Sequence, residues 1–157
     1  MKEFLDRLEA YDLLNFLLPG ILFSVLAPWM TGHSFIQEDL VLGLFVYYFI
    51  GLVISRFGSV VVESFLKWAG ILRFAEYQDF LKAAKKDEKI VLLSRVNNMY
   101  RTLLSMIVVL ILLRCYELLL PNRYWDRYVL VGALLALFLA SYLKQTSYIR
   151  ARVAARR

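Results

Sequence analysis

The sequence predicts an all-α integral membrane protein, a four-helix bundle with helical extensions on its cytoplasmic side. Two properties of the 157 residues lead to this fold class. Hydrophobic residues make up 61% of the chain, whereas a soluble domain has roughly 45–50%. The 19 Lys and Arg residues and the 13 Asp and Glu residues, which leave a net charge of +6, gather in blocks between apolar stretches. We therefore expect a single membrane domain over residues 1–157.

Four stretches have about the length and composition of transmembrane helices, which need about 20 mostly apolar residues. We expect the four spans at about residues 13–30, 40–62, 102–120 and 128–143. A cleaved signal peptide is the competing interpretation of the first stretch, and it requires positive charge at its start. Glu3, Asp6 and Glu9 make this start acidic instead, so we expect the first stretch to remain as a span.

The distribution of Lys and Arg predicts the orientation in the membrane, because positively charged loops stay in the cytoplasm. With four spans, one side of the membrane carries 16 Lys and Arg residues and the other side carries 3. We therefore expect both termini in the cytoplasm. The cytoplasmic parts are then residues 1–12, a segment at residues 63–101 that we expect to be helical with a break at Gly70, and a basic tail at residues 144–157.

Two places inside the spans are candidates for gating or for lining a pore. Pro19 and Gly20 predict a kink or a partly unwound turn, because Pro lacks an amide donor and Gly resists bending least. Arg114 and Glu117 are charged residues near the outer end of the third span, where charge is costly unless it faces a partner, a bundle interior or water. An ordinary kinked helix and a neighbouring ion pair that reaches toward the surface are the alternative interpretations.

Small residues mark one face of the second span. Gly51, Ser55 and Ser59 recur at intervals of four residues, which lets two helix backbones approach closely. We expect subunits of a homo-oligomer to meet partly through this face. The spacing fits a contact within one subunit equally well.

The segment at residues 63–101 contains the largest group of cations. Four lysines have the spacing that gathers them on one face of a helix, with three arginines near them in the sequence. The predicted polyanion site comprises Arg73, Lys82, Lys85, Lys86, Lys89, Arg95 and Arg101. Such a group is attracted to anionic lipids, or it binds a phosphate-bearing ligand whose bases stack on neighbouring aromatic rings.

Motifs of catalysis are missing from the sequence. It has no Gly-x-Ser-x-Gly, no phosphate-binding glycine loop, and only one His and one Cys, which excludes the usual zinc clusters. We therefore expect no catalytic residues, no cofactor and no metal site.

Four stretches together resemble a known family, namely YDLLNFLLPG (11–20), RFGSVVVESFLKWAG (56–70), FAEYQDFLKAAKKD (74–87) and NNMYRT (97–102). They are similar to the small four-span membrane effectors of bacterial anti-phage systems, most of all those of the Hailong type. The resemblance implies a homotetrameric channel in the bacterial inner membrane. It also implies a nucleotidyltransferase-like partner that makes short single-stranded DNA oligomers, which bind the channel and hold it inactive until infection removes them.

The sequence therefore leads to one main expectation and one alternative. The main expectation is a defence effector that forms a homo-oligomeric channel, gated by a nucleotide or a single-stranded DNA oligomer at its basic cytoplasmic face. The alternative is a non-conducting membrane anchor or assembly subunit that recruits a cytoplasmic partner. A membrane enzyme acting on lipid is a third possibility, and the missing catalytic motifs disfavour it.

Overall fold

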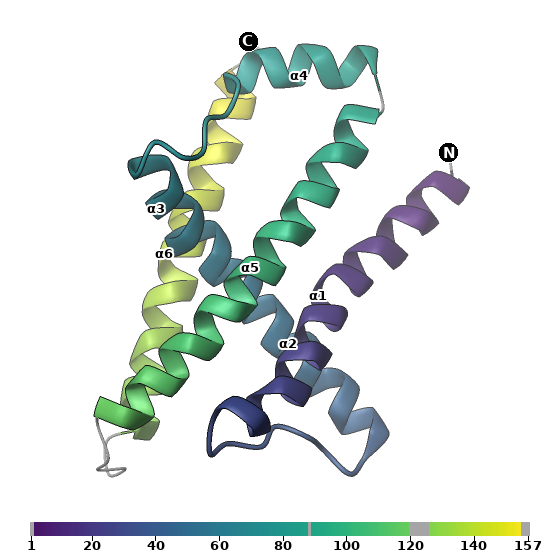
Figure 1. Cartoon of the computed structure of the whole chain (residues 1–157). Helices are drawn as coiled ribbons and strands as arrows, with labels where there is room; N and C mark the ends of the chain where they lie inside the picture. Colours follow the sequence, from purple (N-terminus) through teal and green to yellow (C-terminus); the bar gives the residue numbers. More distant parts are fainter. Residues whose placement is uncertain (1, 88, 120–125, 155–157) are drawn as a thin grey trace.

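A computed structural model describes residues 2–87, 89–119 and 126–154, with side chains at residues 13, 15–87, 89–119 and 128–154. All the regular structure in these ranges is helical (Figure 1). The elements are α1 (Lys2–Met30), α2 (Leu40–Phe57), the π-helix η1 (Gly58–Val62), α3 (Glu63–Trp68), α4 (Tyr77–Lys86), α5 (Lys89–Leu119) and α6 (Asp126–Ala154).

Three helical stretches are long and apolar enough to cross a membrane. They are Leu40–Trp68, Lys89–Leu119 and Tyr128–Ala154, which correspond to α2 with η1 and α3, to α5, and to most of α6. The apolar part of α1, Asn15–Met30, is shorter. The fold class is thus confirmed as all-α with transmembrane-type helices.

The long helices run between two ends of the molecule. In Figure 1, the start of α1, helix α4 and the end of α6 lie in the upper half of the view, and the connection at residues 31–39 lies at the bottom. We call these the α4 end and the loop end. Helix α4 lies across the long helices and joins the turn after α3 to the start of α5.

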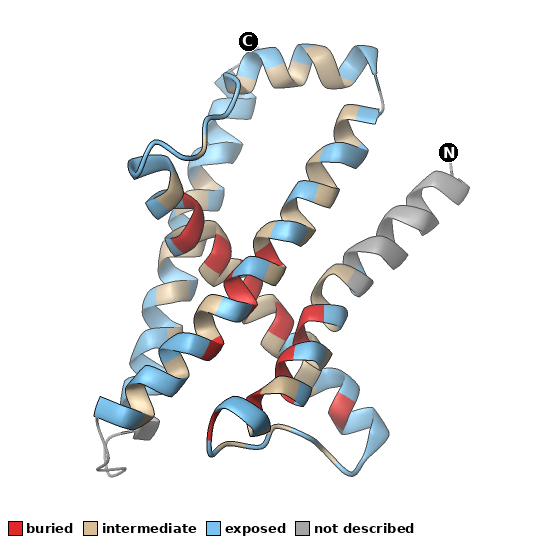
Figure 2. Ribbon diagram, viewed as in Figure 1, coloured by how far each residue is buried: buried red, intermediate tan, exposed pale blue. Residues whose placement is uncertain are grey.

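The core lies where α1, α2 and α5 cross, as the red segments of Figure 2 show. Its buried apolar side chains are Phe23, Ala27, Ile54, Met106 and Leu110. In contrast, every described side chain of α6, residues 128–154, is exposed or half-buried. Three helices therefore share one core, and α6 packs on its outside against α2 and η1.

Glycines, which have no side chain, allow the helices to cross at short distances. A Cβ atom at Gly20 would collide with the Tyr47 carbonyl group, and one at Gly51 would collide with the Phe16 carbonyl group. At both positions the glycine lets the backbones of α1 and α2 lie in contact. A Cβ atom at Gly58 would likewise collide with the hydroxyl group of Ser105 on α5. The glycines thus fix the distances at which the helices pack.

The small-residue face of the second span is used inside the chain. Gly51 meets α1, the Ser55 hydroxyl group lies 3.4 Å from that of Thr102 on α5, and Ser59 accepts hydrogen bonds from Lys144 on α6. Our prediction placed this face between subunits, but at Gly51 and Ser55, both buried, the structure fills it with helices of the same chain. The spacing reports close approach and does not identify the partner helix.

Helix α1 continues without interruption through Pro19 and Gly20, so the unwound turn that we considered there is not formed. Both residues are buried, and Gly20 faces the backbone of α2. These gating candidates therefore lie in a packed interface rather than along an open path. Packing against α2 holds the turn that the proline weakens.

We predicted that the segment at residues 63–101 is helical apart from a break at Gly70, but the structure is helical over less of it. The break at Gly70 is confirmed: α3 ends at Trp68, and Gly70 has a φ of 73°, which glycine adopts without strain. However, residues 71–76 are also non-helical. A second break follows α4, where the Asp87 carboxylate accepts a hydrogen bond of 2.9 Å from the Lys89 amide.

Some predicted features lie outside the described residues. They are the side chains of residues 1–12, residues 120–125 between the third and fourth predicted spans, and the last residues of the basic tail, 155–157.

Replacing Gly51 by Ala should destabilise the bundle by about 1–3 kcal/mol, because the new methyl group overlaps the Phe16 carbonyl group. The matched control is Gly132→Ala on α6, where a Cβ atom meets nothing within 4 Å. This change should leave stability unchanged or raise it by up to about 1 kcal/mol, because Ala favours helix. Unfolding of both variants in mixed detergent micelles measures the difference, and equal effects would contradict the packing described.

Candidate functional site

One buried carboxylate, that of Glu63, joins three cations near the α4 end. Its side chain is 7% exposed. Arg101 of α5 donates to Oε2 at 2.8 Å, Lys67 of α3 donates to Oε1 at 3.0 Å, and Lys144 of α6 donates to Oε1 at 3.2 Å. We call these four residues the Glu63 cluster. It connects α3, α5 and α6 at a single point.

The π-helix η1 determines where Glu63 points. Its turns are wider than those of an α-helix, and the Glu63 amide donates to the Gly58 carbonyl, five residues back. This insertion rotates the residues after it relative to those before it. Glu63 is therefore buried toward α5 and α6, and Lys67, one α-helical turn later, lies on the same face. Lys144 also donates to the carbonyl and hydroxyl groups of Ser59, inside η1.

The cluster carries more positive than negative charge. Three cations surround one carboxylate, and the side chains of Arg101 and Lys144 are only 21% and 23% exposed. Charges removed from water in this way are costly unless they are paired and hydrogen-bonded. In addition, Arg101 Nε is buried and has no hydrogen-bond partner among the described residues. The cluster therefore retains the capacity to bind another anion.

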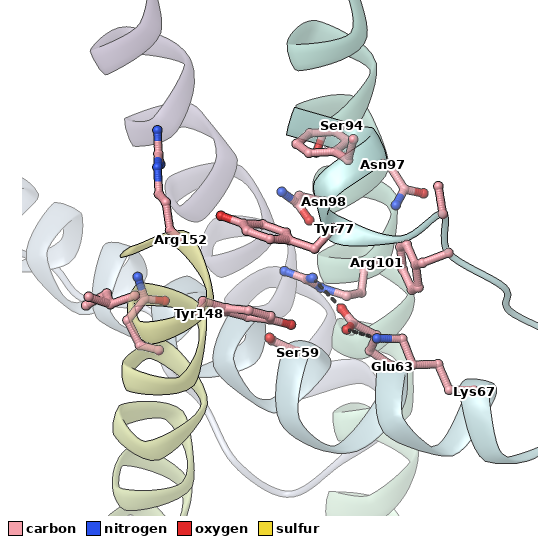
Figure 3. A pocket seen from close by; sticks show the side chains of 15 residues that line it. Ser59, Glu63, Lys67, Tyr77, Ser94, Asn97, Asn98, Arg101, Tyr148 and Arg152 are labelled. Atoms are coloured by element: carbon pink, nitrogen blue, oxygen red, sulfur yellow. Dashed lines mark hydrogen bonds and ion pairs between the residues drawn. The ribbon is translucent and has the colours of Figure 1, made fainter. Parts of the chain in front are cut away.

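A pocket of about 640 Å³ opens beside this cluster (Figure 3). Its walls come from η1, α3, α4, α5, α6 and the non-helical residues before α4. The lining residues are Ser59, Glu63, Lys67, Phe74, Ala75, Tyr77, Phe80, Ser94, Asn97, Asn98, Arg101, Gln145, Tyr148, Ile149 and Arg152.

Aromatic and polar side chains complete the pocket. The rings of Tyr77 and Tyr148 face each other at 6.5 Å between centroids and 22° between planes. They bring α4 and α6 together on one side of the pocket (Figure 3). Asn97 and Asn98 supply amide groups, and Arg152 adds a further cation. The lining thus combines flat apolar surfaces, neutral hydrogen-bonding groups and excess positive charge.

The predicted polyanion residues do not form one site. Arg101 is the only one of them among the residues that line the pocket. Lys82, Lys85 and Lys86 are exposed on α4, whereas Tyr77 and Phe80 of the same helix line the pocket, so the lysines face away from it. Lys89 belongs to α5, because the chain turns at Asp87, and the four lysines therefore do not share one helix.

The two remaining arginines of the predicted site also lie outside the pocket lining. Arg73 is exposed in the non-helical segment between α3 and α4. Arg95 is half-buried on α5. The basic group thus divides into an outward face on α4 and an inward site around Arg101.

Sequence reasoning missed most of the pocket. Glu63, Lys67, Lys144 and Arg152 were not predicted as site residues. One signal was present: Glu63 is an acidic residue directly after an apolar span, and charged groups in such places usually have a partner charge. The partners could not be named, because Arg101 and Lys144 lie 38 and 81 residues away in the sequence.

A second charged group lies at the loop end. Glu117 accepts a hydrogen bond of 2.8 Å from the Gly32 amide and lies 3.3 Å from both His33 and Arg114. The ion pair that was the alternative interpretation of Arg114 and Glu117 is therefore formed. Because Glu117 also holds the connection at residues 31–39, this group ties α5 to the α1–α2 hairpin.

Comparison with protein-family models, with curated proteins and with solved structures finds no match to this chain.

Replacing Glu63 by Gln should destabilise the protein by about 3 kcal/mol, because it leaves partly buried cations without their counter-ion. The matched control, Glu38→Gln, removes a carboxylate that is exposed in the connection before α2 and should change stability by less than about 0.5 kcal/mol. Unfolding in mixed micelles measures both changes. Equal stability of the two variants would show that the cluster contributes nothing.

Proposed function

We propose that this chain is the membrane subunit of an anti-phage effector, a channel controlled by a nucleotide or a short single-stranded DNA oligomer bound at its cytoplasmic end. The observation that carries the ligand part of this proposal is the basic, aromatic pocket beside the Glu63 cluster. The defence context comes from the resemblance of the sequence to membrane effectors of the Hailong type.

The chemistry of the pocket supports a nucleotide-like ligand. Phosphate oxygens would offset the positive charge of Lys67, Arg101 and Arg152, which line the pocket. A base stacks on any aromatic face, and each such contact contributes about 1–3 kcal/mol. Tyr77 and Tyr148 offer such faces within the same pocket.

The positions of the charges support an inner-membrane location with the α4 end in the cytoplasm. The described cations gather at the α4 end, including the lysines of α4, Arg101, Lys144 and Arg152, whereas Arg114 lies near the loop end. Positive residues are retained on the cytoplasmic side. Since α1 runs from the α4 end to the loop end beside α2 (Figure 1), we propose that α1 is the fourth crossing.

The packing of the helices favours a pore between subunits. The crossing of α1, α2 and α5 is filled by the side chains of the core. In contrast, α6 buries none of its described side chains, and Gly132 has open space around it. We therefore propose a cyclic homo-oligomer in which α6, rather than the face of Gly51, meets the next subunit. The nucleotidyltransferase-like partner belongs to the same proposal and comes from the resemblance alone.

Binding of a fluorescent oligothymidylate to the protein in lipid nanodiscs tests the ligand. Arg152→Gln should weaken binding about tenfold, because Arg152 lines the pocket and hydrogen bonds to charged groups contribute about 1.5–3 kcal/mol. Arg150→Gln is the matched control, with the same charge change two residues away on α6 and outside the pocket lining, and it should retain the affinity of the unmodified protein.

Two outcomes would contradict the proposed ligand: no binding by the unmodified protein, or equal losses in both variants at matched salt. Conductance across a planar bilayer, recorded with and without the oligothymidylate, distinguishes a channel from a non-conducting anchor. Ligand-dependent conductance supports the channel. Binding without any conductance supports the alternative, a non-conducting anchor that recruits a cytoplasmic partner.

A further inference from the structure

Helix α6 is attached to the rest of the molecule in an unusual way. None of its described side chains, residues 128–154, is buried. Its ring contacts, Phe138 with Phe49 and Tyr148 with Tyr77, have centroids 6.4 and 6.5 Å apart. Shape-dependent packing of the kind that holds α1, α2 and α5 together is therefore weak at α6, and the attachment must come from elsewhere.

Lys144 supplies a specific polar attachment. Its ammonium group donates to the carbonyl group of Ser59, to the hydroxyl group of Ser59 at 3.1 Å and to Oε1 of Glu63 at 3.2 Å. An ammonium group has three donors, and here all three bond to η1 and the residue after it. The side chains of Lys144 and Glu63 are only 23% and 7% exposed, and hydrogen bonds of charged groups are strong where water is largely excluded.

We infer that Lys144 is a fastener that holds α6 against the π-helix, and that a ligand in the adjacent pocket tightens it. The first part stands on the bonds of Lys144 alone. The second part rests on the proposed function, because it requires an anionic ligand.

The coupling follows from which cations line the pocket. Lys67 and Arg101 line it, whereas Lys144 reaches Glu63 from outside it. Phosphates that bind Lys67 and Arg101 draw these cations away from Glu63. The buried carboxylate then keeps Lys144 as its remaining partner, and their pairing strengthens. Because coupling between two sites is reciprocal, loss of the fastener must weaken ligand binding even though Lys144 does not line the pocket.

The distance between α5 and α6 tests the fastener without any ligand. Spin labels are attached at Leu93→Cys and Ser147→Cys, which replace exposed residues of α5 and α6, in a chain carrying Cys115→Ser. Labelled chains are diluted in an excess of otherwise identical unlabelled chains, so that distances between subunits do not contribute. Pulsed electron paramagnetic resonance on this protein in nanodiscs should give one narrow distance peak. Lys144→Met should lose this peak and give a broad distribution.

The matched control is Lys67→Met. Lys67 pairs with the same carboxylate oxygen as Lys144, but from α3, four residues along the same helical stretch, so it does not hold α6. This variant should keep the narrow peak. Unchanged distributions in Lys144→Met, or equal broadening in both variants, would overturn the fastener. If Lys144→Met does not fold, Lys144→Gln takes its place, because it keeps a polar side chain and removes the charge that pairs with Glu63, and an unchanged distribution there has the same meaning.

The oligothymidylate then tests the coupling. In the unmodified protein it should narrow the distance distribution further, and in Lys144→Met its affinity should fall about tenfold. Equal affinity in the two proteins would overturn the tightening by ligand and leave the fastener in place. Absence of any oligothymidylate binding to the unmodified protein counts against the proposed function instead, since the labels still report on Lys144.

Discussion

The burial of the Glu63 carboxylate is the constraint on which the rest of the structure depends. A carboxylate that is 7% exposed is stable only if other groups replace the water it has lost. Here Lys67, Arg101 and Lys144 replace it, and they come from three different helices. Arg101 and Lys144 thereby join α5 and α6 to α3, the helix that begins at Glu63. The same requirement explains the pocket, because cations gathered around one carboxylate leave positive charge that a ligand can use.

Small residues allow the close helix packing that brings the residues of the Glu63 cluster together. Gly51 lets α1 lie directly on α2, and Ser55 and Gly58 let α5 cross at the level of Thr102 and Ser105. The π-helix follows at once and turns Glu63 toward the other helices. A single stretch of α2 and η1 therefore sets the spacing of the core at one point and the position of the charge a few residues later. The tightly packed helices form a frame, and α6 is joined to this frame at Lys144.

The sequence predicted the general architecture well because hydrophobicity and charge patterns are local. The all-α class, the apolar helices, the break at Gly70 and the pair of Arg114 and Glu117 all follow from residues close together in the chain.

Predictions that depended on partners distant in sequence succeeded less. The face of Gly51 was assigned to a contact between subunits, because spacing identifies a small-residue face but not the helix it meets. The four lysines were assigned to one helix because their spacing is helical. The spacing does not show the turn at Asp87, where a side-chain hydrogen bond to the Lys89 amide separates α4 from α5. The Glu63 cluster required contacts over 38 and 81 residues, which no local pattern encodes.

A structure of the protein in a lipid nanodisc, determined by electron cryomicroscopy, tests this account most directly. The account predicts that the Lys144 ammonium group and the Arg101 guanidinium group both lie within hydrogen-bonding distance of the Glu63 carboxylate. It also predicts that this cluster lies at the level of the inner headgroups. A structure in which Lys144 extends to the lipid headgroups, with α6 separated from η1 and Glu63 paired elsewhere, would contradict it.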